Sequence, residues 1–384
     1  MKLVFKNYCS LIQYLAIQSC HILAILQFTM ADPKLTEGTL YINRDRDFRT
    51  GKWGEYVKIG IVRGDRNAAD RNLEHQTGNP REILTIHELF SPMVEHLETQ
   101  LHHRFSSCWV HGEWFEMDDE TVDNLVLKEA NKIIAQQNES LEDFQAKIEL
   151  RDTLSTDSVR APNNEEQQVA KLCFEAREAL TIASAKKDII DAKLRIAIGE
   201  NNGIEGIANL VYKQGSASFD KKKFMKENET LAEQYMEDRE DKLSGSISLA
   251  KGKSLADLDS ELSDALGEVK SEIPKFKAEL KSKTPRSMNG LLELHAMYVE
   301  SMRDVAVASW EFDRMRARLV RLLGNDKGIE EIITYNRSMK EQAPAFNLTR
   351  FKNENPEIYQ SYLKEGKESV AVSILPYRAY NLDY

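Results

Sequence analysis

The chain has 384 residues, enough for two or three domains. Apolar residues make up 41% of it and charged residues 30%, which is ordinary for a soluble protein but leans towards long charged helices. The net charge of −10 excludes a surface that is basic throughout, so any contact with nucleic acid must be local.

Residues 2–29 are mostly apolar, but polar side chains such as Gln13 and His21 interrupt the run. A membrane-spanning helix needs about 20 predominantly apolar residues, and a secretory signal needs a small-residue cleavage site, which is missing before Met30. We therefore expect residues 1–29 to be an upstream segment outside the fold, with Met30 as the natural start. A weak membrane anchor is the alternative.

The four cysteines are Cys9, Cys20, Cys108 and Cys173. No pair has Cys-x-x-Cys spacing, so the sequence indicates neither a zinc site nor a disulfide framework. This usage is typical of a reducing cytoplasm, and we expect a cytoplasmic protein.

Residues 38–117 combine β-rich runs with helical patterns. Apolar runs at 40–42 and 57–62 predict two strands, and a polar segment follows that ends in the turn residues Gly78-Asn79-Pro80. The amphipathic pattern at 97–105 predicts a helix. The order strand, strand, helix, strand, helix is typical of a small α/β unit.

Five motifs lie in this unit: Tyr41, Lys58-Ile59-Gly60, Arg71, the pattern Glu98-x-x-x-His102-x-x-Phe105, and Gly112-Glu113-Trp114-Phe115. In this order they resemble the GIY-YIG nuclease superfamily, in particular its T5orf172 or Mug113-like branch. Two departures stand out. Lys58 takes the place of the second tyrosine of the wider superfamily, and the late asparagine of many members has no counterpart that we can place.

The resemblance implies hydrolysis of phosphodiester bonds. Tyr41 would assist proton abstraction from water, with Lys58 as a nearby cation that favours the phenolate. Arg71 would offer its planar fork of donors to phosphate oxygens. Glu98 would hold one Mg²⁺ or Mn²⁺ ion. His102 lies at i+4 from Glu98, on the same helical face, and would contact the phosphate or orient the carboxylate.

Each of these side chains also has a purely structural interpretation. Tyr41 would then be a packed aromatic residue, and Lys58 and Arg71 would be solvated charges. Trp114 and Phe115 are expected in the core of the small domain. A confined cationic groove remains possible beside the site, and we expect three side chains to contact DNA there: Arg63, Arg66 and Asn79.

Beyond Asp118 the sequence becomes helical. Apolar periodicity from 120 to about 150 predicts one helix, and a polar break at 153–166 with Pro162 predicts a linker. From residue 167 the chain again has the amphipathic spacing of a coiled-coil-like helical hairpin. The apolar positions there are Val169, Leu172, Ala176, Ala179, Leu180 and Ala183.

The second half of the chain repeats itself. Residues 194–199 are similar in sequence to residues 319–324, and the run from Phe219 to Tyr235 is similar to the run from Phe346 to Tyr362. Each copy predicts a long helix, a glycine stop, a short β-like excursion and a short helix ending in tyrosine. Between the copies we expect a turn at 244–254 and a charged helix at about 255–280.

The repeated unit resembles the segment that follows the catalytic core of YqaJ-type phage recombination exonucleases. The catalytic Asp…Glu-x-Lys constellation of that family is not found, so we infer no second nuclease. One interpretation is a scaffold of helical arms that sets the oligomeric state or holds the nuclease at a fixed reach. The other is that basic residues of the β tips touch DNA: Lys221, Lys222, Lys223, Arg350 and Lys352.

The sequence thus predicts an α+β protein, with a small GIY-YIG-type α/β nuclease domain before a mostly α-helical, coiled-coil-like region whose two internal repeats carry short β tips. The expected divisions are 1–29 leader, 30–120 nuclease domain, 121–165 helix and linker, 166–243 repeat 1, 244–288 connecting helix, and 289–384 repeat 2 with the tail.

The predicted function is that of a metal-dependent DNA endonuclease of phage or mobile-element type. We expect DNA as the partner, including branched or nicked forms, and a homo-oligomer that assembles through the helical arms. A membrane is not expected as a partner. The alternative is a non-catalytic nucleic-acid-binding or assembly protein that retains the nuclease fold.

Overall fold

A computed structural model of the chain describes residues 33–64, 66–77, 79–198, 203–204, 206–279 and 291–375. The protein has a mixed α/β fold, with an N-terminal sheet domain followed by a mostly helical region, which confirms the predicted fold class. The expected leader at 1–29 lies outside the described residues. Among the helices that are described, none is long and apolar enough to cross a membrane.

The N-terminal domain is built on a five-stranded sheet in the order β3-β1-β2-β5-β4. Its strands are β1 (Gly38–Arg46), β2 (Trp53–Arg63), β3 (Glu82–Ser91), β4 (Trp109–His111) and β5 (Trp114–Glu116). All neighbouring pairs are antiparallel. The hairpin of β4 and β5 was not predicted, because three-residue strands carry too little periodicity to recognise.

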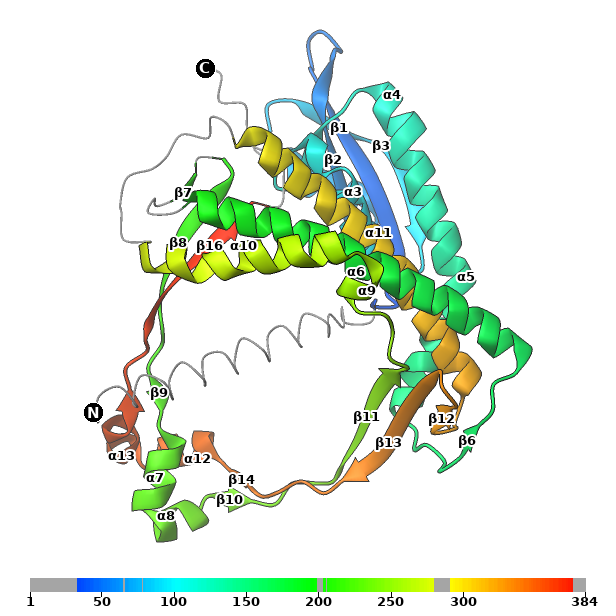
Figure 1. Cartoon of the computed structure of the whole chain (residues 1–384). Helices are drawn as coiled ribbons and strands as arrows, with labels where there is room; N and C mark the ends of the chain where they lie inside the picture. The colour runs from blue at the N-terminus through cyan, green and yellow to red at the C-terminus, as the bar shows by residue number, and fades with distance from the viewer. Residues whose placement is uncertain are drawn as a thin grey trace. The chain divides into compact units, whose positions relative to one another are not determined.

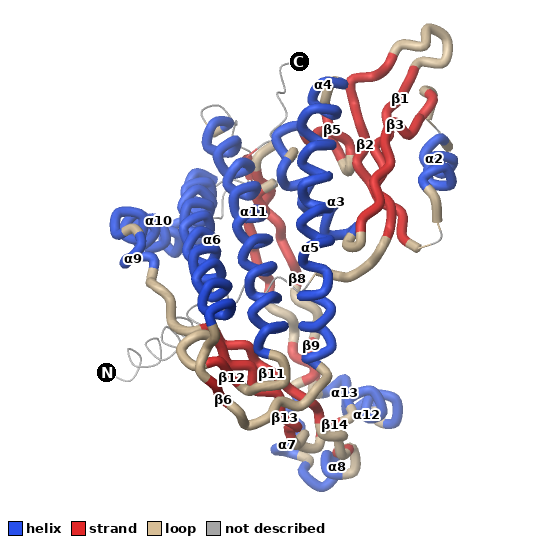
Figure 2. The backbone as a smooth tube through the Cα atoms, turned by 90° about the vertical axis from the view of Figure 1, so that its right-hand side faces the viewer, coloured by secondary structure: helices blue, strands red, loops and turns tan. Residues whose placement is uncertain are grey.

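Helices cover both faces of this sheet (Figure 2). α3 (Val94–Arg104) packs Leu97 and Leu101 on one face, where the apolar core of the domain lies. α2 (Ala68–Gln76) lies on the opposite face, and its Ala68 packs with Tyr41. Because side chains alternate along a strand, β1 sends its aliphatic residues towards α3 and Tyr41 towards α2. Phe115 is fully buried in the core, as expected.

Outside the two strand-containing segments described below, the helical region contains three short and four long helical elements among its described residues. They are α4 (Asp119–Thr121), a π-helical turn (Val122–Val126), α5 (Leu127–Arg151), α6 (Asn164–Ile198), α9 (Leu255–Leu258), α10 (Ser260–Glu279) and α11 (Leu292–Leu323). α6 and α11 lie side by side, while α10 packs on α6 and α5 packs on α11 (Figure 1). The pair of α6 and α11 is therefore flanked by α10 on the α6 side and by α5 on the α11 side.

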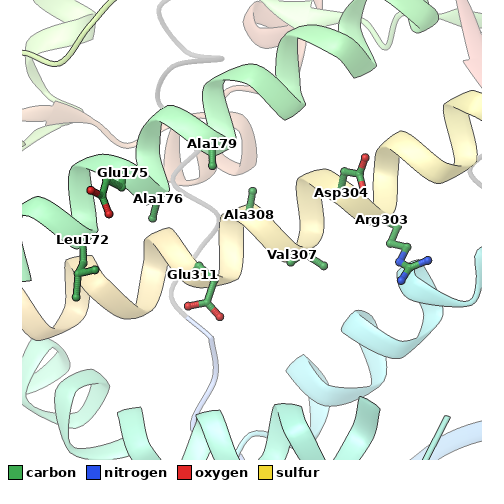
Figure 3. A pocket seen from close by; sticks show the side chains of 9 residues that line it. All are labelled: Leu172, Glu175, Ala176, Ala179, Arg303, Asp304, Val307, Ala308 and Glu311. Carbon is green, nitrogen blue, oxygen red and sulfur yellow. The ribbon is translucent and has the colours of Figure 1, made fainter. Parts of the chain in front are cut away.

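The predicted apolar stripe of α6 is partly wrong. Val169 is buried with Ala170 and Cys173, but the side chain of Leu172 is 51% exposed. Leu172 instead lines a hollow of about 610 Å³ between α6 and α11, together with Ala176, Ala179, Val307 and Ala308 (Figure 3). The apolar spacing alone did not show which side of α6 faces α11, and the buried side is that of Val169, Ala170 and Cys173.

Two similar segments of strands and short helices follow α6 and α11. The first contains β7 (Gly203–Ile204), β8 (Ala208–Gln214), β9 (Ser218–Phe219), α7 (Lys221–Glu227), α8 (Glu229–Glu233), β10 (Met236–Glu237) and β11 (Lys242–Leu249). The second contains β12 (Gly328–Ile329), β13 (Ile333–Lys340), β14 (Ala345–Phe346), α12 (Leu348–Glu354), α13 (Pro356–Ser361), β15 (Leu363–Lys364) and β16 (Glu368–Ile374). β6 (Val159–Arg160) pairs in parallel with β12.

The two segments exchange strands. β11 pairs with β13 and β16 pairs with β8, so the last strand of each segment completes a sheet begun by the other. The short strands do the same, because β10 pairs with β14 and β15 with β9. The segments are therefore held together by four antiparallel strand pairs (Figure 1).

One part of this exchange contradicts the sequence analysis. The turn expected at 244–254 is β11 as far as Leu249, and only the residues after it form a loop. The stretch is rich in serine and glycine, which favours turns. Its strand conformation depends on backbone pairing with β13, which the local sequence does not report.

An aromatic node joins the two segments where their short helices meet. Phe224 and Phe351 are fully buried there, with ring centroids 4.5 Å apart. The Tyr235 hydroxyl donates to Glu354 of the other segment at 2.8 Å and accepts from Asn355 at 2.6 Å. Residues matched by the sequence repeat make the reciprocal contacts, in which the Tyr362 hydroxyl bonds Glu227 and Asn228.

Arg337 ties the ends of two helices to β13. Its side chain is buried, and its guanidinium donates to the Leu150 carbonyl at 3.1 Å and to the Gly324 carbonyl at 3.0 Å. These carbonyls lie at the carboxyl ends of α5 and α11, where backbone acceptors lack helical partners. Gly324 ends α11 with φ of 61°, a conformation that favours glycine.

We expect Arg337→Met to lower the free energy of unfolding by about 3 kcal/mol, because both carbonyls lose a charged donor. Urea denaturation would measure the change. Lys340→Met, at an exposed position on the same strand, is the control and should change stability little. Equal stability of the two variants would contradict this role.

A buried polar contact joins α3 to the helical region. The His96 ring lies 4.0 Å from the Trp310 ring of α11, and its Nδ1 accepts from the Gln137 amide of α5 at 3.0 Å. Burial lowers the pKa of His96 to about 3, with a smaller contribution from the Arg104 charge. The imidazole is therefore neutral in the folded protein at all but strongly acid pH.

This shift predicts a loss of stability on acidification. The unfolded chain takes up a proton at His96 near pH 6.5, whereas the folded protein does not until about pH 3, so stability falls as pH drops below about 6.5. Between pH 7 and pH 5 His96 should account for as much as about 2 kcal/mol of that fall. Comparing the pH dependence of urea denaturation in the native protein and in His96→Gln measures it. Identical slopes would refute it.

Candidate active site

The register of β1 and β2 places Tyr41 opposite Gly60. A Cβ at position 60 would lie 2.5 Å from the Tyr41 hydroxyl oxygen and 2.6 Å from its Cζ. Only glycine leaves room for the tyrosine ring to lie across β2. This explains physically why a glycine follows Lys58-Ile59 on the second strand.

α2 supplies the cation next to Tyr41. The Arg71 guanidinium lies close enough to Tyr41 to lower the pKa of its hydroxyl, and it forms an ion pair with Glu74. One turn further on, the His75 ring centroid is 6.1 Å from that of Tyr41. A polar clasp fixes this helix on the sheet, because Asn72 hydrogen-bonds both Asn43 on β1 and Thr85 on β3.

α3 supplies Glu98 and His102. His102 Nε2 lies 3.0 Å from the Ile59 carbonyl oxygen, just past the point where β2 stops pairing with β5. Burial lowers the pKa of His102, so the neutral ring donates its Nε2 proton to this carbonyl. His102 thereby fastens α3 to β2, and its Nε2 proton is used in a hydrogen bond to the backbone. Glu98 lies one turn earlier and is half-buried.

The turn between β4 and β5 brings in Glu113, which the sequence analysis did not single out. Its carboxylate forms an ion pair with Lys58 at 2.6 Å, and its carbonyl accepts from the Ile59 amide at 3.1 Å. Lys58 is nearly buried. The predicted partner of Lys58 was the Tyr41 phenolate, whereas the structure pairs it with this carboxylate.

The surroundings of Tyr41 favour its neutral form. Burial is the main cause, the Glu113 charge adds to it, and Arg71 opposes both; together they raise the pKa of Tyr41 to about 12. Burial and the Glu113 charge also raise the pKa of Glu98 to about 7, against the opposing effects of Arg63 and Lys58. These mutual influences show that Tyr41, Glu98 and Glu113 share one electrostatic environment.

The structure therefore brings the five predicted side chains Tyr41, Lys58, Arg71, Glu98 and His102 into one region. Sequence reasoning missed two of their neighbours, His75 and Glu113. His75 lies at i+4 from Arg71, and this spacing was a usable signal on a predicted helix. Glu113 gave no such signal, because its position depends on an unpredicted hairpin.

The donors suit a hard divalent cation. Mg²⁺ is commonly bound through one or two carboxylates and several waters. Glu98 provides one, and the Glu113 charge close to it makes a cation there favourable, because a cation offsets the repulsion that raises the pKa of Glu98. Among the described residues, no group of three or more His, Cys, Asp or Glu side chains is placed to hold a metal ion.

The three side chains that were expected to contact DNA make contacts with other residues of the chain. Arg63 pairs with Glu95 at 2.6 Å, and Arg66 pairs with Glu74. The Asn79 side chain accepts from the Arg81 amide at 2.9 Å and so closes the turn after α2.

The basic residues of the repeats lie on the aromatic node. Three of their cations stack on rings: Lys221 on Phe346, Lys223 on Tyr362 and Lys352 on Tyr359. Arg350 stacks on Tyr235 and pairs with Glu354. Lys222 is exposed. Most of these charges thus contribute to the packing of the node.

We expect Gly60→Ala to displace the Tyr41 ring and to destabilise the protein by about 2 kcal/mol, because the added methyl group overpacks the contact. Thermal or urea unfolding would measure it, and near-ultraviolet circular dichroism would report the displaced ring. Gly267→Ala in α10 is the matched control, since a Cβ there meets nothing within 4 Å. A neutral Gly60→Ala would show that Tyr41 does not need this space.

Residues 38–131, about a quarter of the chain, match the family model described as T5orf172 domain. This family is associated with GIY-YIG nucleases, so the match indicates a nuclease-like or DNA-binding function for the N-terminal domain. No curated protein and no solved structure matches the chain. The Mug113-like branch and the YqaJ resemblance of the repeats stay predictions. The N-terminal domain is thus similar to T5orf172 domains.

Proposed function

We propose that the chain is a metal-dependent DNA endonuclease that hydrolyses phosphodiester bonds with a GIY-YIG-type site. The observation that supports this proposal is that Tyr41, Arg71 and Glu98, from three different elements, lie near enough for Arg71 and Glu98 to influence the pKa of Tyr41. A phage or mobile-element role rests on the family resemblance alone.

Arg71 is the residue that best fits phosphate binding. Its guanidinium is partly exposed and lies near the Tyr41 hydroxyl, so a phosphate bound by Arg71 would lie close to that hydroxyl. A planar fork of donors suits the charge that develops on phosphate oxygens during the displacement. Lys58, held by Glu113, adds a second positive charge nearby.

Tyr41 would handle a proton. Its hydroxyl is neutral at pH 7, so it positions the attacking water and passes the proton to a neighbour that can take it. His75 is a candidate, because its ring centroid lies 6.1 Å from that of Tyr41 and its buried Nδ1 has no hydrogen-bond partner among the described residues; burial lowers its pKa, so the imidazole is neutral at pH 7.

Glu98 would hold Mg²⁺ or Mn²⁺, with Glu113 close by. A cation bound there supplies charge compensation for the phosphate. The residues of the chain would do the rest: Glu98 would supply a carboxylate whose ionised form the cation favours, Glu113 keeps Lys58 in place, and His102 fixes the helix that carries Glu98.

One observation favours a second function, a non-catalytic nucleic-acid-binding protein. Burial raises the pKa of Tyr41 to about 12, which makes this tyrosine a poor base by itself. In that case the fold would bind nucleic acid through Arg71 and Lys58 without cleaving it.

Nicking of supercoiled plasmid with Mg²⁺ or Mn²⁺ separates the two. We expect cleavage by the native chain, loss of it in Glu98→Gln, and a reduction of about 10²–10⁴-fold in Tyr41→Phe. Glu142→Gln, an exposed carboxylate on α5, should cleave normally and is the control. Cleavage that survives in Glu98→Gln would refute the assigned site. No cleavage of plasmid, branched or single-stranded DNA would favour the binding function.

A further inference from the structure

Several exposed aromatic side chains lie at the end of the β1–β2 hairpin where its turn is. Among the described residues, four aromatic side chains are exposed: Phe48, Trp53, Tyr56 and Phe90. Three of them lie within nine positions of the hairpin, and Phe48 at its turn is 63% exposed. Single exposed apolar residues are normal on a protein surface, but a cluster of aromatic rings is typical of binding surfaces.

The turn that presents Phe48 is rigid. The Asp47 carboxylate accepts hydrogen bonds from the Arg49 amide at 3.0 Å and from the Thr50 amide at 2.7 Å. The Asp47 backbone bonds Lys52 and Gly51 across the turn at 2.9 Å. Phe48 is thus held outward by its neighbours, and binding through it costs little ordering of the backbone.

Basic residues lie among the rings, interleaved with acidic residues of which Asp45 and Asp47 pair with Arg81. Arg46 stacks on Trp53 with 5.5 Å between guanidinium carbon and ring centroid. Arg49 and Lys52 are exposed and form no ion pair with any described carboxylate. In a chain with a net charge of −10, two unpaired cations beside exposed rings are a local exception. Phe48, Arg49, Lys52, Trp53 and Tyr56 are called the aromatic tip below.

The aromatic tip is connected to the candidate active site by the same two strands. Tyr56 precedes Lys58 by two residues on β2, so strand alternation puts both on the face that carries Tyr41. Arg46 lies five residues from Tyr41 on β1, roughly 17 Å along an extended strand, and this odd spacing puts Arg46 and the Trp53 ring that it stacks on at the opposite face. A nucleic acid bound at Tyr41 and running along this face would pass Tyr56 and reach Phe48 at the turn of the hairpin.

We propose that the aromatic tip binds unpaired bases of the substrate by stacking, with Phe48 as the main platform and Arg49 and Lys52 on the flanking phosphates. This inference rests on the proposed nuclease function and names its substrate class, a nucleic acid with accessible base faces beside the cleaved strand. Aromatic platforms combined with cations are the usual means of holding single strands, because every base has a face on which a ring stacks. A fully paired duplex offers no such face to Phe48.

The test measures binding in a Glu98→Gln background, so that cleavage plays no part. Fluorescence anisotropy compares a duplex carrying a short single-stranded gap with the fully paired duplex of the same sequence. Phe48→Ala should weaken binding of the gapped duplex roughly tenfold and leave the paired duplex nearly unchanged. Phe48→Tyr should retain binding. Leu154→Ala, an apolar side chain 56% exposed in the loop after α5, is the matched control and should have no effect.

A second readout reports the stacking itself. A fluorescent purine analogue in the gap should be quenched by the parent protein and by Phe48→Tyr, but not by Phe48→Ala. Arg49→Gln should weaken both duplexes and reduce the salt dependence of binding.

Several results would overturn the inference. They are unchanged binding of the gapped duplex by Phe48→Ala, equal weakening of both duplexes, or a parent protein that binds neither. Loss of binding to anionic phospholipid vesicles instead of DNA would assign the tip to a membrane surface. Failure of the nuclease proposal looks different, because the native chain would then cleave nothing while gap binding still depended on Phe48.

Discussion

The pairing of β1 with β2 is the constraint on which the candidate site depends. Because successive side chains of a strand face opposite ways, a slip of one residue would send Tyr41 into the apolar core under α3. The observed register holds Tyr41 against Gly60, within reach of Arg71 on α2. The aliphatic residues of the same strands then fill the other face. Core packing and site geometry are thus set by a single choice of register.

Ion pairs hold the charged side chains that lie near the paired strands β1 and β2. Glu113 pairs with Lys58, and Arg71 is shared between Tyr41 and Glu74. Burial raises the pKa values of Tyr41 and Glu98, and the charge of Glu113, which steadies Lys58, adds to both shifts. Without a bound cation, the carboxylates of Glu98 and Glu113 repel each other, and a cation bound there would reduce this repulsion. Sites built for binding commonly give up stability in this way.

The sequence was informative where motif and periodicity coincide. Tyr41, Gly60 and the i, i+4 pair of Glu98 and His102 could be placed because strands and helices fix which neighbours meet. Glu113 could not be placed, since its approach depends on the short hairpin of β4 and β5. β11 and the exposure of Leu172 were missed for a similar reason, because both are decided by a distant partner. Contacts between residues far apart in the sequence were thus the part of the fold that local sequence patterns did not predict.

The exchange of strands between the two segments has a consequence for synthesis of the chain. β8 pairs with β16, and Ala208 lies opposite Ile374, although nearly half of the sequence separates the two residues. When the ribosome releases β8, its partner has not yet been made, and an edge of unpaired backbone stays open while more than a hundred further residues are added. Loop closure over such a span is slow. The first segment must therefore wait for the second, and the interval before β16 arrives is when the nascent protein is most vulnerable to aggregation.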